Sequence, residues 1–345
     1  MGDHPDEDAW LIVYLSMGLL VYWLIIEYKM AAVKNYLSLI KFSHSIFAMP
    51  FALIGFFLGL DYFSALSSLT TGEYVRYTFS DLRAEDFVKH DLFSIQFWVF
   101  KFSLVILCMI FARSAAMAFN RWLDKNFDAR NPRTAIREIP AGIVNANNAL
   151  IFVIINCIAF IVCCWFINRL CFYLSFVALF VVLFYSYTKR FTALCHLVLG
   201  IGLSLAPIGA YLAVTGSFAV LPILFSFTVL FWVSGFDIIY ALQDEEFDKV
   251  NQLHSIPAAV GKVRALRISE LLHVLSTVCV VYAGIYGKFG LWYWVGIAVF
   301  LGMLVYQHSI VKPNDLRRVN IAFMTANGIA SVVFSIFVLA DLFLR

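Results

Sequence analysis

Acidic side chains recur at four-residue spacing in two separate parts of the sequence. Asn120, Asp124 and Asp128 form the first set, and Asp244 and Asp248 form the second. Residues four apart lie on one face of an α-helix, so each set is expected to present its oxygen atoms along a single face. Mg²⁺ prefers a few carboxylates together with phosphate oxygens and water. Two such faces opposed across a cavity could therefore hold Mg²⁺ ions that bridge a diphosphate.

Basic residues crowd the first acidic set. They are Arg121, Lys125, Arg130, Arg133 and Arg137. Acids that hold a metal beside bases that hold phosphate suit a diphosphate ligand. The simpler alternative for this set alone is a solvated helix end whose acids pair with Lys125 and Arg130.

The second acidic set continues a helix face that begins inside an apolar segment. Asp237, Tyr240, Asp244 and Asp248 follow one another at spacings of three, four and four residues. Asp237 lies in the run FWVSGFDIIYAL, where a lone charge is costly unless it has a partner or faces a wet cavity. Two such faces in one membrane chain would be a rare coincidence, which favours the metal and diphosphate interpretation.

The elements that position these residues must cross a lipid bilayer. Of the 345 residues, 62% are hydrophobic and only 14% are charged, and one soluble core cannot bury that much apolar surface. Apolar segments of roughly 20 residues predict membrane spans. They lie near residues 10–29, 35–60, 94–119, 147–167, 170–187, 193–214, 218–241, 264–287, 291–308 and 319–344.

We therefore expect an all-α fold, a multi-pass transmembrane helical bundle with nine core helices and one extra N-terminal helix. Residues 1–34 would form an acidic tail and the extra helix, and residues 35–345 the bundle, with an external hydrophilic insert at about 61–93. Lys and Arg concentrate in the loops that carry or follow the acidic sets, which places these loops in the cytoplasm. The active site would then face the cytoplasm from the inner membrane. A net charge of +3 gives no reason to expect a nucleic-acid partner.

Two segments resemble the signatures of the UbiA superfamily of intramembrane prenyltransferases. NRWLDKNFDARNPRTAIREIPAG is similar to the first signature and DIIYALQDEEFDKVNQLHSIPAAVG to the second. YSYTKRFT, HLVLGIGLSLAPIGAYLAVTG and RRVNIAFMTANGIAS are similar to blocks of its 4-hydroxybenzoate polyprenyltransferase branch. The resemblance implies a nine-helix bundle around a cavity that opens sideways to lipid. It also implies Mg²⁺-dependent transfer of a polyprenyl group from a polyprenyl diphosphate to the ring of an aromatic acid, in ubiquinone or menaquinone synthesis.

The resemblance also implies roles for individual positions. Asn120, Asp124 and Asp128 match the first metal-diphosphate motif, and Asp244 and Asp248 match the second, so that the four carboxylates would be catalytic through Mg²⁺. Four basic residues would hold diphosphate oxygens or an acceptor carboxylate, namely Arg133, Arg137, Lys189 and Arg190. Tyr187 and Tyr240 would contact the diphosphate or stabilise the allylic cation through their ring faces.

The acceptor is less clearly indicated than the diphosphate. Arg121 follows Asn120 where many members have Asp, and KFSHSIFAMPFALIGF lacks the Arg-x-Asp-[Arg/Lys]-Pro-Ile-Gly opening of the better-known ubiquinone enzymes. This pattern is closer to members associated with menaquinone made through the futalosine route, whose acceptor would be a dihydroxynaphthoate. His44 and His196 lie in apolar helices, where a hydrogen-bonded packing histidine is usual and contact with the acceptor is the alternative.

Three other functions compete with this interpretation. A secondary transporter also places acids inside a membrane, but it does not explain why both acidic sets lie at one membrane face with basic companions. A CDP-alcohol phosphotransferase would need an Asp-Gly-x2-Ala-Arg string, which the sequence lacks. Haem or chlorophyll-type prenylation within the superfamily remains an alternative.

Overall fold

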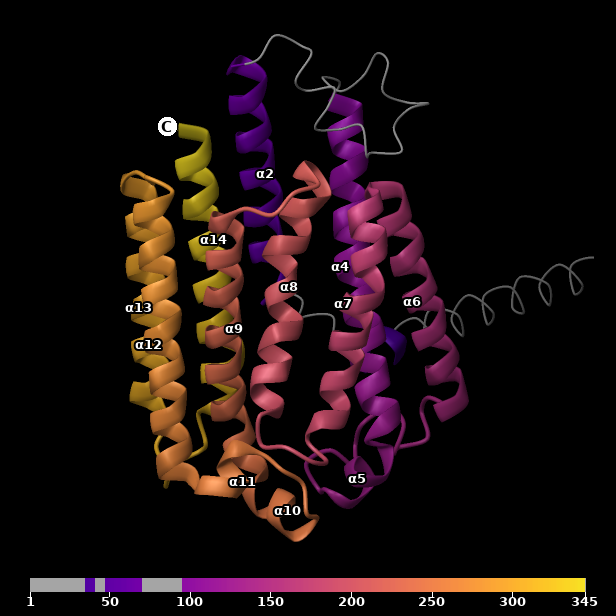
Figure 1. The fold of residues 1–345 in the computed structure, drawn as a ribbon. Coiled ribbons are helices and arrows are strands. Elements are labelled where there is room, and N and C mark those ends of the chain that lie inside the picture. The colour runs from indigo at the N-terminus through magenta and orange to yellow at the C-terminus, as the bar shows by residue number, and fades with distance from the viewer. Residues whose placement is uncertain (1–34, 41–46, 70–94, 345) are drawn as a thin grey trace, which may run out of the picture.

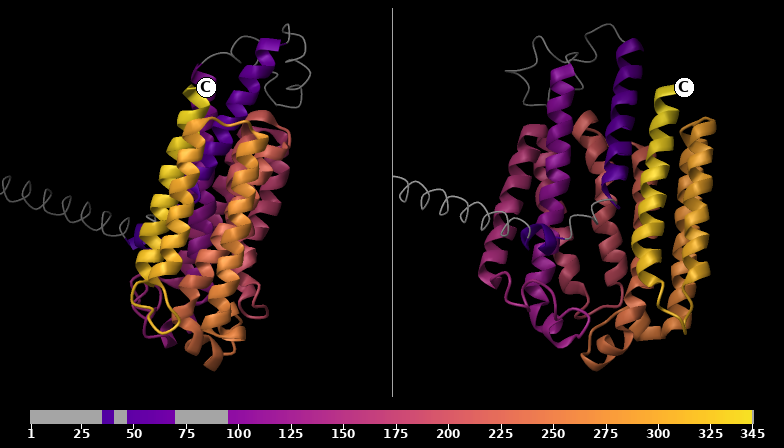
Figure 2. Two further views of the ribbon diagram at one scale, coloured as in Figure 1. Left: turned by 90° about the vertical axis from the view of Figure 1, so that its left-hand side faces the viewer. Right: turned by 180° about the vertical axis from the view of Figure 1, so that it is seen from behind.

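The long helices run roughly along one axis and form a single bundle (Figure 1). Figure 2 shows the same alignment from two further sides. The computed structural model describes residues 35–40, 47–69 and 95–344, and within these ranges it contains helices and no β-strand. The expected all-α bundle is confirmed. The extra N-terminal helix expected at residues 10–29 lies outside the described residues.

Nine long helices build the described part of the bundle. They are α2 (Met49–Leu69), α4 (Ile95–Leu123), α6 (Ala146–Ile167), α7 (Arg169–Thr188), α8 (Cys195–Thr215), α9 (Val220–Ala241), α12 (Lys262–Tyr286), α13 (Leu291–Ile310) and α14 (Asn327–Leu344). A π-helical segment, Ile321–Ala326, leads directly into α14. Eight helical stretches are long and apolar enough to cross a membrane, and α2 contributes a shorter apolar helix over Met49–Tyr62.

The first core helix departs from its expected boundaries. It begins at Met49 rather than near residue 35, with Pro50 in its first turn. A proline there costs no internal hydrogen bond, because the first N–H groups of a helix have no partner within it. The helix continues to Leu69, so the start of the segment expected as a hydrophilic insert is helical, and residues 70–93 lie outside the described ranges.

Helices α2 and α8 lie between two groups of helices. One group is α4, α6 and α7, and the other is α9, α12, α13 and α14. The approach of α2 to α8 depends on Gly55, because a Cβ built there would lie 2.0 Å from the Pro207 carbonyl oxygen. The absence of a side chain at this position lets the two backbones pack directly against each other.

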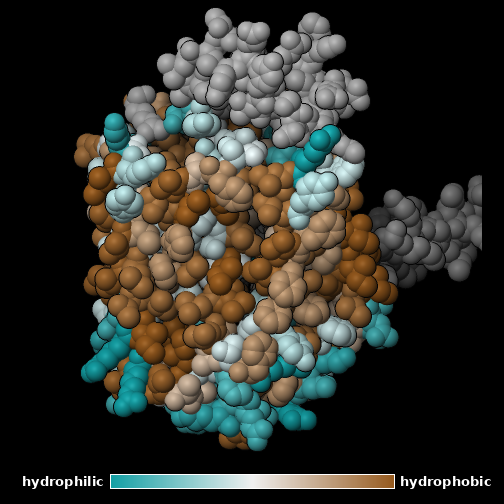
Figure 3. Space-filling model, in the orientation of Figure 1, coloured by the Kyte–Doolittle hydropathy of each residue, from teal (hydrophilic) through white to brown (hydrophobic). Residues whose placement is uncertain are grey.

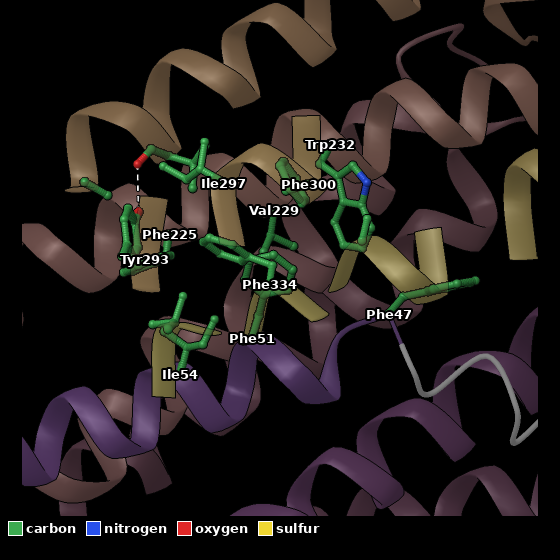
Figure 4. Packing of buried hydrophobic residues seen from close by; sticks show 14 of the residues in the cluster. Phe47, Phe51, Ile54, Phe225, Val229, Trp232, Tyr293, Ile297, Phe300 and Phe334 are labelled. Atoms are coloured by element: carbon green, nitrogen blue, oxygen red, sulfur yellow. Dashed lines mark hydrogen bonds between the residues drawn. The ribbon is translucent and has the colours of Figure 1, made fainter. Parts of the chain in front are cut away.

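Aromatic side chains fix the second group around α9 (Figure 4). Trp232 of α9 is fully buried and packs against Phe51 of α2 and Phe300 of α13. Its indole nitrogen donates a 2.9 Å hydrogen bond to the Asn327 side-chain oxygen, which also accepts from Gln307. Because this packing fixes the rotation of α9, it decides which residues of that helix face the interior of the bundle.

The surface separates into an apolar belt and a polar end. Figure 3 shows hydrophobic side chains across the middle of the visible face and hydrophilic ones along its lower edge, near α5 (Lys125–Arg130), α10 (Glu245–Val250) and α11 (Ile256–Val260). Such a belt suits contact with lipid tails. The three short helices and their loops therefore form the part of the bundle that lies nearest to water on this side.

Candidate active site

Both acidic motifs lie at the polar end, and each spans a break between two helices. Asp124 separates α4 from α5, while a 3₁₀ turn over Leu242–Asp244 separates α9 from α10. The four-residue spacing of each motif therefore runs across a short break in the helix. Four-residue contacts persist across the first break, where the Asp128 N–H donates to the Asp124 carbonyl oxygen at 2.8 Å. The acidic side chains consequently stay close along each motif.

Each of the four motif carboxylates contacts a cation. The pairs are Asp124 with Arg190 at 3.2 Å, Asp128 with Arg137 at 2.6 Å, Asp248 with Lys189 at 2.7 Å, and Asp244 with Arg133. A carboxylate removed from water needs such a partner, since an unpaired buried charge is costly. The basic residues expected to hold a diphosphate are thus the same residues that neutralise the acids in this structure.

Arg133 connects the two motifs directly. It lies in the loop after α5 and donates from its Nε and Nη2 atoms to the two oxygens of Asp244. Its Nη1 donates to the Tyr240 hydroxyl at 2.9 Å, and the Tyr240 ring is in turn packed on Phe323, with ring centroids 4.3 Å apart. Asn131 donates a further 3.2 Å hydrogen bond to Asp244. The second motif is therefore held by the loop of the first.

Burial and charge pairing shift the pKa of the charged groups at this site in opposite directions. Burial raises the pKa of Asp124 above its usual range, although the bond from Arg190 opposes the shift. Burial alone would lower the pKa of Lys189, but the Asp248 carboxylate outweighs it and the pKa is raised. The pKa of Arg133 is likewise raised by Asp244 against the effect of burial. Both cations stay charged and available for an anionic ligand.

The donor set suits a divalent cation only together with an anion. In the described ranges no three His, Cys, Asp or Glu side chains converge as a preformed metal site, because each motif acid turns toward its own cation. Asp128 is buried, and no described residue hydrogen-bonds its Oδ2 atom. Buried polar atoms normally have a hydrogen-bond partner, so this free oxygen is available to bind a metal ion. A diphosphate that took the cations would leave all four carboxylates for Mg²⁺.

The motifs line a polar cavity of about 280 Å³, which adjoins an apolar one of about 340 Å³. The apolar cavity lies among α2, α4, α6, α7 and α8. The two cavities share five lining residues, Arg113, Met117, Tyr185, Leu199 and Leu203. A ligand with a charged head and a long apolar tail could therefore occupy both at once.

Most of the residues expected at the site reach the polar cavity. Its lining includes Asn120, Asp124, Asp128, Arg133, Arg137, Lys189, Arg190, His196, Tyr240, Asp244 and Asp248. Tyr187 is the exception among the described ones, because it is 47% exposed and its ring lies against Arg190 instead. Successive residues of a helix point about 100° apart, so Tyr185 and Ser186 face the cavity and Tyr187 turns away. His44 lies outside the described residues.

Asn131 and Asp237 also belong to the site, although neither was among the residues expected to bind substrate. Asn131 follows Asp128 by three positions, and this helical spacing could have indicated its contact with Asp244. Asp237 has a hydrogen-bonding partner and a place on the cavity wall, as its apolar sequence context requires. Its Oδ2 atom lies 2.7 Å from Nδ1 of His196, and its side chain lines the polar cavity. This arrangement favours the hydrogen-bonded alternative for His196.

The fold and the site together define a multi-pass membrane protein with an acid and base pocket at one end of its helical bundle. The model of the UbiA prenyltransferase family matches residues 93–329. The 4-hydroxybenzoate octaprenyltransferase of Nitrosomonas europaea is 32% identical over 241 residues, which cover 70% of this chain and 82% of that protein. The enzyme of the same name from Nitrosospira multiformis is 30% identical, with 67% and 80% covered.

Solved structures agree with this relationship at the level of the fold. The apo structure of a UbiA homolog from Aeropyrum pernix K1 has a TM-score of 0.66 at 24% identity, and the match covers 87% of this chain and 97% of that one. A UbiA homolog from Archaeoglobus fulgidus bound to GPP and Mg²⁺ has a TM-score of 0.59 at 18% identity, with 89% and 99% covered. The chain belongs to the UbiA prenyltransferase family. It is therefore a membrane-embedded prenyltransferase, which sets aside the transporter alternative.

Proposed function

We propose that this prenyltransferase transfers a polyprenyl group from a polyprenyl diphosphate to the ring of a phenolic acid in respiratory quinone synthesis. The observation that carries the proposal is that a cavity lined by four paired carboxylates adjoins an apolar cavity and shares lining residues with it. The curated relatives favour 4-hydroxybenzoate as the acceptor. The opening of the first core helix and Arg121 favour a dihydroxynaphthoate, which makes it the second acceptor to test.

The charged residues would divide between the two parts of a metal diphosphate. Asp124, Asp128, Asp244, Asp248 and the Asn120 amide oxygen would hold Mg²⁺, which when bound neutralises charge on the leaving diphosphate. Arg133, Arg137, Lys189 and Arg190 would release the carboxylates and bind the diphosphate oxygens. This exchange keeps every buried charge paired before and after binding, so little desolvation cost is added.

The apolar cavity would hold the part of the prenyl chain nearest to the reacting carbon. Its lining comes from apolar side chains such as Met109, Phe160 and Leu174. Tyr185 lines both cavities, so it would lie next to the bond that breaks. Its ring, and that of Tyr240, could stabilise an allylic cation through their faces while the walls exclude water.

The site would face the cytoplasm from the bacterial inner membrane. The loops at the polar end carry the basic residues of the site together with Lys249, Lys312, Arg317 and Arg318. An excess of Lys and Arg marks the cytoplasmic side of a membrane protein. Both proposed substrates are consistent with this side, since an aromatic acid would arrive from water and a prenyl diphosphate from the adjoining lipid.

Transfer can be tested directly with membranes that contain the chain. The membranes would be incubated with Mg²⁺, a radiolabelled polyprenyl diphosphate and each candidate aromatic acid, followed by identification of the product. We expect a ring-prenylated acid that disappears in EDTA, and we expect Asp124→Ala and Asp244→Ala each to abolish it. Asp315→Ala is the matched control, because Asp315 is a partly exposed acid at the same end that forms an ion pair with its neighbour Arg317 and does not line the cavity. Full activity in EDTA or in either motif variant would contradict the proposal.

A further inference from the structure

Asp237 is a fifth carboxylate in the polar cavity, and it lies deeper in the bundle than the acidic motifs. It precedes Asp244 by seven residues, which is two helical turns or about 10 Å along the axis. Its neighbours Phe236 and Ile238 are buried, whereas the Asp237 side chain is 23% exposed. Since Asp237 lines the cavity, this exposure is to the cavity. With the diphosphate held by the acidic motifs, the carboxylate would lie at the depth where the prenyl carbon and the acceptor ring meet.

His196 determines how Asp237 is presented. The backbone N–H of Ile256 donates to Nε2 of His196 at 3.3 Å, so this nitrogen carries no proton. Nδ1 then carries the proton that is donated to the Asp237 Oδ2 atom at 2.7 Å. His196 is itself 2% exposed, with both ring nitrogens engaged. It holds one oxygen of Asp237 and leaves the other directed to the cavity.

Asp237 differs from the other acids that line the cavity in the kind of partner it has. Asp124, Asp128, Asp244 and Asp248 are each paired with Arg or Lys. The partner of Asp237 is the ring of a buried histidine, and no described residue donates to its Oδ1 atom. A carboxylate in this state retains its negative charge and has a free oxygen within the cavity. It is therefore suited to take up a proton, a role that cation-bound carboxylates fill poorly.

We propose that Asp237 is the catalytic base that takes the proton from the phenolic hydroxyl of the acceptor, with His196 as its positioning residue. This assignment rests on the proposed function, which supplies a phenolic acceptor. A phenol has an ordinary pKa of about 10, so a local base is needed to make its ring strongly nucleophilic at neutral pH. A well-placed general base contributes about 10²- to 10⁴-fold in rate.

In the proposed step one C–O bond breaks and one C–C bond forms. The allylic C–O bond breaks and the diphosphate leaves with the bonding electron pair. The ring carbon ortho to the hydroxyl forms the new C–C bond, while Oδ1 of Asp237 takes the hydroxyl proton and the O–H pair becomes the carbonyl bond of a neutral cyclohexadienone. The proton on the newly substituted carbon then passes to the diphosphate, and the carbonyl oxygen recovers a proton from Asp237. The products are the prenylated phenol and protonated diphosphate, with Asp237 regenerated.

The test compares Asp237→Asn with the wild-type chain on acceptors that differ in the acidity of the hydroxyl. The full chain in lipid nanodiscs would be assayed with 4-hydroxybenzoate and with its 3-fluoro derivative, whose hydroxyl is more acidic. We expect kcat for 4-hydroxybenzoate to fall about 10²- to 10⁴-fold in Asp237→Asn. The loss should shrink with the fluorinated acceptor, which needs the base less. Each loss is the ratio of the wild-type kcat to the Asp237→Asn kcat for the same acceptor, so the effect of fluorine on ring reactivity cancels.

Two further measurements separate a catalytic role from a structural one. Binding of a non-hydrolysable prenyl diphosphate analogue should be unchanged in Asp237→Asn, which also reports that the variant is folded. His196→Gln should give a smaller loss with the same dependence on acceptor acidity. Asp341→Asn is the matched control, because Asp341 is a buried membrane carboxylate that binds the backbone N–H groups of Gly290 and Tyr293, away from the cavity. Any change in kcat in Asp341→Asn should be the same for both acceptors.

The outcomes distinguish the base assignment from the proposed function. An equal loss with both acceptors in Asp237→Asn, wild-type turnover in that variant, or loss of analogue binding would each overturn the assignment while leaving prenyl transfer in place. A wild-type chain that prenylates neither phenolic acid would overturn the proposed function and the assignment together.

Discussion

Arg133 and Asp244 form an ion pair across 111 positions of sequence, and this pair joins the two acidic motifs. The guanidinium also donates to the Tyr240 hydroxyl, so one side chain holds both the last turn of α9 and the start of the second motif. A bidentate contact of this kind fixes orientation as well as charge. Ligand binding that draws Arg133 toward a diphosphate would therefore also release Asp244.

Replacing Arg133 should affect both turnover and folding stability. Arg133→Ala leaves Asp244 with the Asn131 amide as its remaining side-chain donor in the described ranges. We expect a loss of about 2–4 kcal/mol in transition-state stabilisation, as for other preorganised donors to developing charge. Steady-state kinetics would give kcat/KM, and a thermal unfolding scan would show a lower Tm. Arg133→Lys keeps the charge but not the bidentate geometry, so its kcat/KM and Tm should lie between those of the wild-type chain and Arg133→Ala. Wild-type kinetics in Arg133→Ala would refute this role.

Two tyrosines on α7 provide a test of which helix face meets the substrate. Tyr185 lines both cavities, whereas Tyr187 is half exposed and packs against Arg190. We expect Tyr185→Ala to lower kcat at least tenfold, because an aromatic wall at the reacting carbon is removed. Tyr187→Ala should change kcat by less than about threefold, since exposed substitutions outside a site usually have small effects. The reverse order would mean that α7 is rotated from the position described here.

A side chain placed in the apolar cavity should shorten the prenyl chain that the enzyme accepts. Gly209 lines this cavity, and a Cβ there would meet no atom within 4 Å. Gly209→Leu should therefore fold normally while it raises KM for long prenyl diphosphates more than for short ones. Gly302→Leu is the control, because Gly302 on α13 is equally open but lies outside both cavities. Competition between diphosphates of different length would measure the preference, and an unchanged preference in Gly209→Leu would place the chain elsewhere.

The orientation of the bundle can be measured by cysteine labelling. Asn126 and Glu246 are exposed at the polar end, and Lys288 is exposed in the turn between α12 and α13 at the opposite end. In a background without the native cysteines, Asn126→Cys and Glu246→Cys should react with an impermeant maleimide only from the cytoplasmic side. Lys288→Cys should react only from outside. Labelling of all three from one side is incompatible with the helix count.

The sequence by itself determined the class of protein and the composition of the site. An apolar fraction of 62% in segments of membrane-spanning length leaves a helical bundle in lipid as the available fold, because backbone groups in lipid must be paired within each segment. The four-residue spacing of Asp124 and Asp128, and of Asp244 and Asp248, placed each pair on one face through local geometry alone. The cost of a lone charge in lipid indicated that Asp237 would have a partner or face a wet cavity.

Only the tertiary structure decided how these groups are paired. The rotation of α7 about its axis selects Tyr185 over Tyr187 for the cavity, and this rotation depends on packing against neighbouring helices rather than on spacing along α7. The contacts of Arg133 with Asp244 and of His196 with Asp237 join segments far apart in the chain. Such contacts depend on how the helices pack together and on the path of the loops that connect them. Local periodicity therefore gave the residues of the site, and bundle packing gave each residue its partner.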